Sequence, residues 1–167
     1  IFKKNIDKNN KINYTGCQPM KNFKPNYSKL KLKPYLKNII LNKIKILNKN
    51  YIFVHIRRTD HIQNAKKNNC YTKDQLFFNF LDKIYDKDIY IATDNKITYD
   101  IFKKKYEKRI KFDYHKVNKY SLRKTSLCDA IIDIYMCVYS DNFMGSGYSS
   151  FSEFIIALKN YNKIKKI

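Results

Sequence analysis

Two adjacent arginines are the residues of this sequence with the plainest chemical use. Arg57 and Arg58 lie in the stretch His55-Ile-Arg-Arg-Thr-Asp60, although only four of the 35 basic residues are arginines. A guanidinium forms paired hydrogen bonds to a phosphate and keeps its charge at any working pH. The pair therefore predicts a site where a phosphate leaves and its growing negative charge is stabilised, with Asp60 orienting the arginines. A structural Arg–Asp ion pair is the alternative.

A small-residue turn, Met144-Gly-Ser-Gly-Tyr-Ser-Ser-Phe-Ser-Glu153, predicts a second phosphate contact. An apolar run precedes this turn and a helix start follows it. Free N–H groups and the positive end of the dipole at a helix N-terminus favour an anion, and Ser149 and Ser150 add hydroxyl donors. The spacing matches neither the Walker loop nor GxGxxG. An ordinary capped strand-to-helix turn is the alternative.

Two acidic residues complete the set. Asp94 follows an apolar run, as Arg57 does, and a turn-forming Asp-Asn pair is the alternative there. Asp133 lies in an apolar helical stretch, where a carboxylate is costly unless it has a partner. A carboxylate can accept both the N1 and the N2 hydrogens of guanine. Alternatively Asp133 faces solvent or caps a neighbouring group, because Asp129 precedes it by four residues and shares its helical face.

The elements around these residues alternate between strand and helix. Short apolar runs predict strands over 51–56, 89–92, 110–112 and 142–144. Apolar spacing predicts helices from Pro34 to about 48 and over 97–106. Capping patterns that begin at Thr72, Ser126 and Ser150 predict three more: one after Thr72, one from Leu127 to about 139, and one through 158. Buried strands separated by helices indicate an α/β fold, a Rossmann-like parallel sheet flanked by helices. Ligands bind at the carboxyl ends of such strands, where the candidate residues fall.

Composition excludes several classes of protein. Lysine supplies 31 of the 35 basic residues and is spread along the whole chain, so we interpret the net charge of +21 as a general basic surface and expect no specific nucleic-acid partner. The four cysteines have no zinc spacing, we expect no disulfide framework, and Cys128 and Cys137 are predicted as core residues. With no long apolar run and a polar stretch at 1–15, we expect a soluble chain without a transmembrane or signal segment, its compartment left open.

The order of these motifs resembles a known group of enzymes. His55–Asp60, Tyr90–Asp94 and Asp133–Ser152 are similar to three motifs in the C-terminal, nucleotide-binding half of GT-B glycosyltransferases with the HxRRxD motif. These are the α1,2-, α1,6- and protein O-fucosyltransferases. The resemblance covers about residues 50–160. It implies a hexosyltransferase that takes GDP-fucose as donor, inverts the anomeric carbon, needs neither metal nor other cofactor, and acts on a glycan or glycoprotein acceptor.

The resemblance also implies roles for individual residues. Arg57 matches the catalytic arginine that grips the β-phosphate, Arg58 its supporting partner, and Asp133 the carboxylate that reads guanine. The other binding positions that it implies are His55, Asp60, Asp94, Ser149, Ser150 and the backbone at Phe151.

The sequence departs from the family pattern in two respects. Residues Ile62–Lys73 contain no Asp or Glu, whereas an acidic residue soon after the first motif is the candidate base in the α1,6 branch, so no base is identified. Residues 1–49 are too short for the family's N-terminal domain. We expect them to be an irregular lead-in plus one helix, the remnant or end of a missing domain, with a nucleotide-sugar-binding domain over 50–167. A non-catalytic sugar-nucleotide- or glycan-binding relic, and a basic nucleic-acid-binding α/β protein, remain alternative hypotheses.

Overall fold

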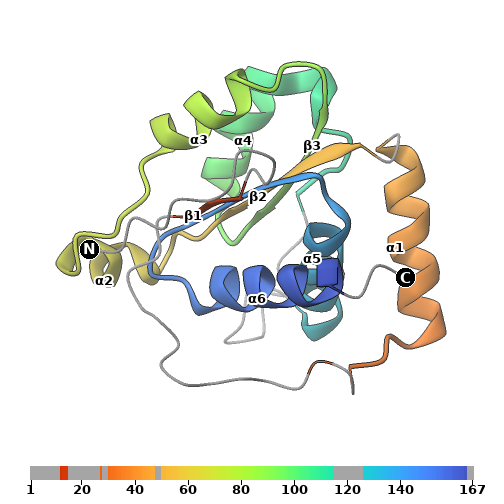
Figure 1. Cartoon of the computed structure of the whole chain (residues 1–167). Helices are drawn as coiled ribbons and strands as arrows, with labels where there is room; N and C mark the ends of the chain where they lie inside the picture. The colour runs from red at the N-terminus through yellow and green to blue at the C-terminus, as the bar shows by residue number, and fades with distance from the viewer. Residues whose placement is uncertain (1–11, 15–26, 28–29, 48–49, 115–125, 165–167) are drawn as a thin grey trace.

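Four parallel strands organise the part of the chain that the structure describes. The computed structural model describes residues 12–14, 27, 30–47, 50–114 and 126–164. The strands are β1 (Ile12–Tyr14), β2 (Tyr51–Ile56), β3 (Asp88–Thr93) and β4 (Asn142–Gly145), in the sheet order β1-β4-β2-β3 (Figure 1). All three pairings are parallel, which confirms the predicted sheet. Because β2 lies between β3 and β4, residues that follow these three strands meet at one edge.

Helices cover both faces of this sheet. They are α1 (Pro34–Ile46), α2 (His61–Lys67), α3 (Asp74–Asp82), α4 (Lys96–Tyr106), α5 (Leu127–Tyr139) and α6 (Ser150–Ile164). Successive residues of β2 point to opposite faces: Phe53 packs in a core with α1, α5 and α6, whereas Ile52 and Val54 pack against α3 and α4. Every residue of β2 is buried. This two-sided burial explains the continuous apolar runs in the sequence.

Two strand predictions are wrong. Residues 1–49 were expected to hold an irregular lead-in before one helix, but Ile12–Tyr14 pairs with β4 as β1. Conversely, 110–112 was expected to be a strand, but Ile110 makes only an isolated bridge to Ile89, after a short 3₁₀ turn at Glu107–Arg109. α2 was not predicted either, since its seven residues include only two apolar ones, Ile62 and Ala65.

The predicted helix caps hold in one case and fail in two. The Ser126 hydroxyl accepts from the Asp129 N–H at 3.1 Å and begins α5, as predicted. Thr72 does not cap α3: the N-cap is Lys73, and Thr72 Oγ1 accepts instead from the Gly147 N–H at 2.8 Å. The cap of α6 lies one residue earlier than predicted, because the Ser149 carbonyl accepts from the Glu153 N–H at 3.0 Å and Ser150 is already helical.

A buried lysine joins α5 to α6. Lys159 is 2% exposed, and its ammonium group donates to the carbonyl oxygens of Cys137 at 3.0 Å, of Val138 at 3.1 Å and of Ser140. These carbonyls belong to the last turn and the end of α5, which has no intrahelical donors for them. The positive charge also favours this end of the helix dipole. Lys159 therefore terminates α5 from the neighbouring helix.

The cysteines differ from expectation. Cys137 is buried in the core, as predicted, but Cys128 is exposed on α5. Cys70 is disulfide-bonded, a bond that the expectation of no disulfide framework did not include. Spacing alone did not reveal this bond.

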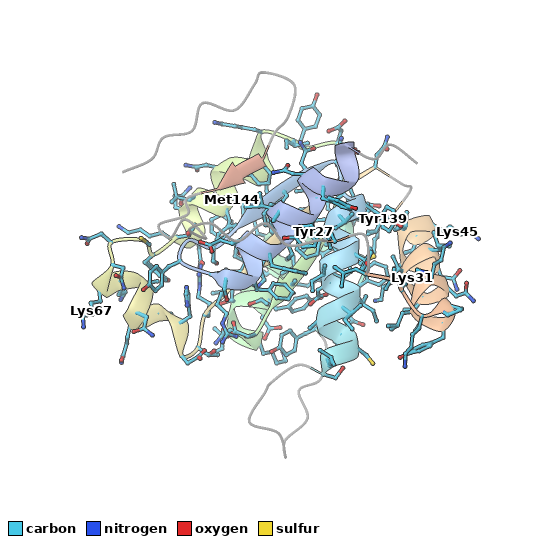
Figure 2. The ribbon with its side chains drawn as sticks, turned by 60° about the horizontal axis from the view of Figure 1, so that its bottom comes forward. Tyr27, Lys31, Lys45, Lys67, Tyr139 and Met144 are labelled. Carbon is cyan, nitrogen blue, oxygen red and sulfur yellow. The ribbon has the colours of Figure 1, made fainter. Side chains whose placement is uncertain are left out.

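The surface carries its charge on many elements. Lys45 on α1 and Lys67 on α2 project from opposite ends of the molecule (Figure 2). Within the described residues, no helix has the length and apolar character needed to cross a bilayer. The predicted division of the chain at residues 49 and 50 stays a prediction, although α1 and β2 pack in the same core.

Candidate active site

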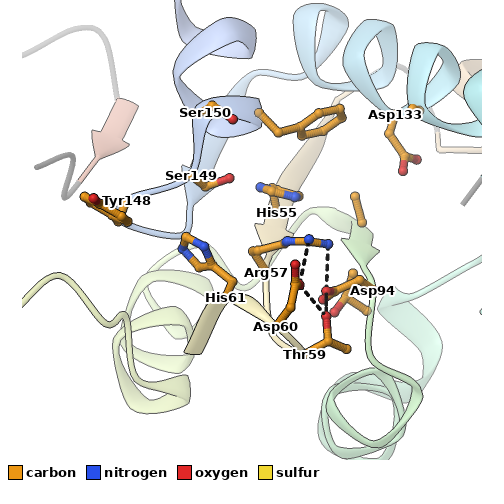
Figure 3. A pocket seen from close by; sticks show the side chains of 14 residues that line it. His55, Arg57, Thr59, Asp60, His61, Asp94, Asp133, Tyr148, Ser149 and Ser150 are labelled. Atoms are coloured by element: carbon orange, nitrogen blue, oxygen red, sulfur yellow. Dashed lines mark hydrogen bonds and ion pairs between the residues drawn. The ribbon is translucent and has the colours of Figure 1, made fainter. Parts of the chain in front are cut away.

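A cavity of about 880 Å³ opens at the carboxyl edge of the sheet, where β2 and β3 end and α6 begins (Figure 3). It is lined by His55, Arg57, Thr59, Asp60, His61, Ala92, Thr93, Asp94, Ala130, Asp133, Tyr148, Ser149, Ser150 and Phe151. Eight of the nine residues predicted for the site are among them; Arg58 is the exception. Side chains from three widely separated parts of the sequence thus share one space.

Two carboxylates hold the Arg57 guanidinium at the cavity. Nη1 donates to Asp94 Oδ2 at 2.8 Å and Nη2 donates to Asp60 Oδ1 at 2.8 Å. The Arg57 side chain keeps 35% of its surface exposed. Since a guanidinium has five N–H donors and these two bonds use two of them, donors remain for a ligand. Arg57 is therefore oriented by the protein yet available to an anion.

The Asp94 carboxylate accepts hydrogen bonds from three consecutive residues that follow β2. Besides Arg57, its carboxylate accepts from the Arg58 backbone N–H at 2.7 Å and from the Thr59 hydroxyl. Thr59 has φ 41°, a left-handed conformation that is unfavourable for a β-branched residue. The bond to Asp94 helps to stabilise this bend. The alternative reading of Asp94, as a turn former only, does not describe these contacts.

Arg58 points away from the cavity. It is 4% exposed, and Nη2 donates to Asp74 and, at 3.1 Å, to the Thr72 carbonyl oxygen. Its guanidinium carbon lies 5.1 Å from the centre of the Tyr71 ring. The two adjacent arginines therefore differ: Arg57 faces the cavity, whereas Arg58 fastens the loop before α3.

His55 lies in the wall of the cavity. Its Nδ1 is 2.8 Å from Ser152 Oγ, and its ring centre is 4.8 Å from that of Phe151. Burial, chiefly, lowers the pKa of His55 to about 3, so the ring is neutral at pH 7. His55 is thus a neutral, packed surface beside the start of α6.

Asp133 occupies another part of the cavity wall, away from Ser149 and Ser150 (Figure 3). It is 8% exposed, and its Oδ1 accepts from the Tyr90 hydroxyl at 2.9 Å. Burial raises the pKa of Asp133 to about 7, which the Tyr90 hydrogen bond and Lys43 partly oppose. The interpretation that Asp133 faces solvent is wrong, and the carboxyl changes protonation near neutral pH.

The turn from β4 into α6 brings the start of a helix to the cavity. Ser149, Ser150 and Phe151 line it, and the first amides of a helix have no intrahelical acceptor. Gly145 permits this close approach: a Cβ at that position would lie 2.6 Å from Ser152 Oγ and 2.8 Å from the Phe143 ring. Without Gly145, α6 would have to move away from β4 and His55.

Several lining residues escaped the sequence analysis. Thr59 and His61 follow the arginines directly, and Tyr148 lies inside the glycine-serine turn, so sequence proximity was the available signal. Ala130 precedes Asp133 by three residues and so shares its face of α5. Among the described residues, no group of three or more His, Cys, Asp or Glu side chains is arranged to hold a metal ion.

Comparison with known proteins identifies the family. The family model described as GDP-fucose protein O-fucosyltransferase matches residues 2–162. No curated protein matches the chain. The matched range runs from before β1 into α6 and contains every residue of the cavity. The chain therefore belongs to the GDP-fucose protein O-fucosyltransferase family and is a fucosyltransferase-like member of the glycosyltransferases.

Proposed function

We propose that this chain binds GDP-fucose in the cavity and transfers fucose, with inversion, to a glycan or protein acceptor. The observation that carries this proposal is that one cavity presents positive charge at one part of its wall and a carboxylate at another. Arg57 and the start of α6 offer positive charge to a diphosphate, while Asp133 offers a carboxylate to a base. Guanine presents two adjacent N–H donors to such a carboxylate, which favours it over uracil and adenine.

The arrangement suits departure of a nucleoside diphosphate. When the bond between the fucose anomeric carbon and the β-phosphate oxygen breaks, negative charge grows on that oxygen. Arg57 is already held by Asp94 and Asp60 at 2.8 Å, so it needs little reorganisation to stabilise this charge. In this proposal Arg57 and the α6 amides supply the positive charge, and the reaction requires no metal or further cofactor.

A nucleotide panel tests the proposed donor. Isothermal titration of GDP, UDP, ADP and CMP in the presence of EDTA should give the tightest binding for GDP. Asp133→Asn should reduce this preference by roughly 10-fold or more, since a bidentate base contact contributes about 1–3 kcal/mol. Asp129→Asn is the matched control, because Asp129 lies one turn earlier on α5 and outside the cavity wall.

The outcomes of the panel separate the parts of the proposal. Equal affinity for all four nucleotides would contradict the guanine assignment. Binding that appears only after a divalent cation is added would contradict metal independence. A non-catalytic binding relic, suggested by the lack of an acidic residue over Ile62–Lys73, would bind GDP but release none from GDP-fucose.

A further inference from the structure

We infer that His61 is the general base of the transfer, an inference that rests on the proposed function above. In an inverting transfer the acceptor oxygen forms a bond to the anomeric carbon while the bond to the β-phosphate breaks. GDP leaves with the electron pair of that bond, and the acceptor O–H proton must pass to a base. In this assignment the proton passes to Nδ1 of His61, and the imidazolium later returns it to water.

The carboxylates beside Arg57 are poor bases for this step. Asp94 accepts from Arg57, the Arg58 N–H and Thr59. Asp60 accepts from the Thr59 hydroxyl at 3.0 Å and from Arg57 at 2.8 Å, and these contacts, Thr59 first, lower its pKa. A carboxylate stabilised in this way has little tendency to take a proton.

The other titratable groups in the cavity wall are engaged elsewhere. His55 is buried, its pKa is about 3, and its Nδ1 bonds Ser152. Asp133 accepts from Tyr90 on the part of the wall assigned to the guanine base. Among the residues that the structure places in this wall, His61 is the remaining side chain with a nitrogen suited to accept a proton.

A backbone carbonyl fixes the tautomer of His61. Its Nε2 lies 3.1 Å from the Gly147 carbonyl oxygen. A carbonyl oxygen can only accept, so Nε2 carries the hydrogen and, in the neutral ring, Nδ1 carries the lone pair. No described residue forms a hydrogen bond to Nδ1. The tautomer is therefore the one that a base needs.

The position of the ring is fixed as well. His61 is the first residue of α2, and its ring stacks on Tyr148 with centres 6.1 Å apart and planes at 29°. Figure 3 shows the ring in the cavity beside Arg57 and below Ser149. The charged or titratable groups around it are Asp60, Arg57, His55 and Tyr148. His61 and Arg57, which in this proposal act on the acceptor and on the departing phosphate, thus face the same cavity.

The test measures GDP released from GDP-fucose, with water as acceptor, alongside GDP affinity. His61→Ala and His61→Gln should lower turnover by about 10²–10⁴-fold and leave the Kd for GDP within about 2-fold. Added imidazole should restore part of the turnover of His61→Ala. Gln63→Ala, an exposed change on the same helix, is the control.

The outcomes distinguish this inference from the proposed function. A wild-type chain that binds no GDP overturns the proposed function and the base with it, and so does one that binds GDP without releasing any from GDP-fucose. If the wild type turns over and His61→Ala keeps its rate, or imidazole restores nothing, the base assignment alone is wrong. Nitrogen-15 NMR of the GDP complex gives a readout independent of activity: a neutral His61 ring with its proton on Nδ1 would also overturn the assignment.

Discussion

At the scale of single residues, the adjacent arginines illustrate what the sequence can and cannot tell. The run of Arg57 and Arg58 beside Asp60 predicts an anion site at a strand end, and the structure places Arg57 at a cavity there. It did not reveal that only Arg57 lines the cavity, because that depends on the bend at Thr59 with φ 41°. Nor did it reveal the role of Asp94, whose contacts require β2 and β3 to pair with Ile56 beside Thr93.

Substitutions of the two arginines should therefore have different effects. Arg57→Ala should lower GDP release from GDP-fucose by about 10²–10³-fold with a smaller loss of GDP affinity, because in the proposed function its charge acts most on the departing phosphate. Arg57→Lys should not restore the rate, since an ammonium lacks the planar fork. Arg58→Ala should instead lower the free energy of unfolding by about 2–3 kcal/mol, because it removes the buried ion pair to Asp74 and the hydrogen bond to the Thr72 carbonyl oxygen.

Turnover, GDP titration and urea unfolding of both variants check this contrast. A folded Arg57→Ala chain with near-normal turnover would make the motif structural and would contradict the catalytic role of Arg57. Equal loss of stability in the two variants would contradict the separate roles.

Asp133 predicts a dependence on pH. Its folded pKa of about 7 lies above the unfolded value near 3.8, so its contribution to stability declines as pH rises from about 4 to 7, by at most about 1.4 kcal/mol per pH unit. Asp133→Asn should remove this decline and be the more stable chain at pH 8. In the proposed function guanine binds the ionised carboxylate, so the GDP affinity of the wild type should rise over the same range.

Urea unfolding and GDP titration from pH 5 to pH 8 measure both effects. His55, with its pKa lowered to about 3, contributes with the opposite sign, so the difference between wild type and variant isolates Asp133. A GDP affinity that is flat across this range would contradict the role of Asp133 in reading the base.

At the scale of elements, long apolar patterns were predictable and short polar ones were not. β2, β3, β4 and α5 follow from buried runs or helical spacing, since both faces of the sheet are covered. β1 has three residues, and α2 is seven mostly polar residues, so neither carries a periodic signal. Thr72 has the spacing of a helix cap, but its hydroxyl accepts a hydrogen bond from the Gly147 N–H in a loop far along the sequence. No local pattern can show such a contact.

The junction of β4 with α6 gives a prediction at this scale. Gly145→Ala should lower the free energy of unfolding by about 1–3 kcal/mol, the usual range for overpacking, because the new methyl meets Ser152 and Phe143. It should also weaken GDP binding by moving the start of α6. Asn160→Ala, an exposed change in the same helix, should do neither. Chemical unfolding and GDP titration of both variants check this. A Gly145→Ala chain with the stability of the wild type would contradict the tight packing described above.

At the scale of the whole molecule, net charge is the dominant property. The net charge of +21 is spread over many elements, as Lys45 and Lys67 at opposite ends illustrate (Figure 2). Such a field attracts an anionic ligand over a distance without forming a defined contact. We therefore expect the basic surface to attract the proposed donor and the cavity to recognise it.

Capture should consequently depend on salt. The association rate constant of a fluorescent GDP analogue should fall by about 10-fold or more from 0.05 to 0.5 M NaCl, as screening shortens the reach of the charge. Guanosine, which has no phosphate, is the control and should bind with little dependence on salt. Stopped-flow fluorescence and competition with guanosine measure the two. A salt-independent rate for the GDP analogue would show that the lysines have no part in its capture.

The lysine between α5 and α6 has a practical consequence for a chain so rich in amines. Among the lysines whose side chains the structure describes, Lys159 is the one buried, at 2% exposure. Amine-acylating reagents will mark the other described lysines in the native state, but they can reach Lys159 only when the two helices separate. The rate at which this amine is acylated, measured by mass spectrometry of peptides, therefore reports how often α5, the helix that carries Asp133, separates from α6. Slower acylation at saturating GDP would show that the nucleotide holds the two helices together.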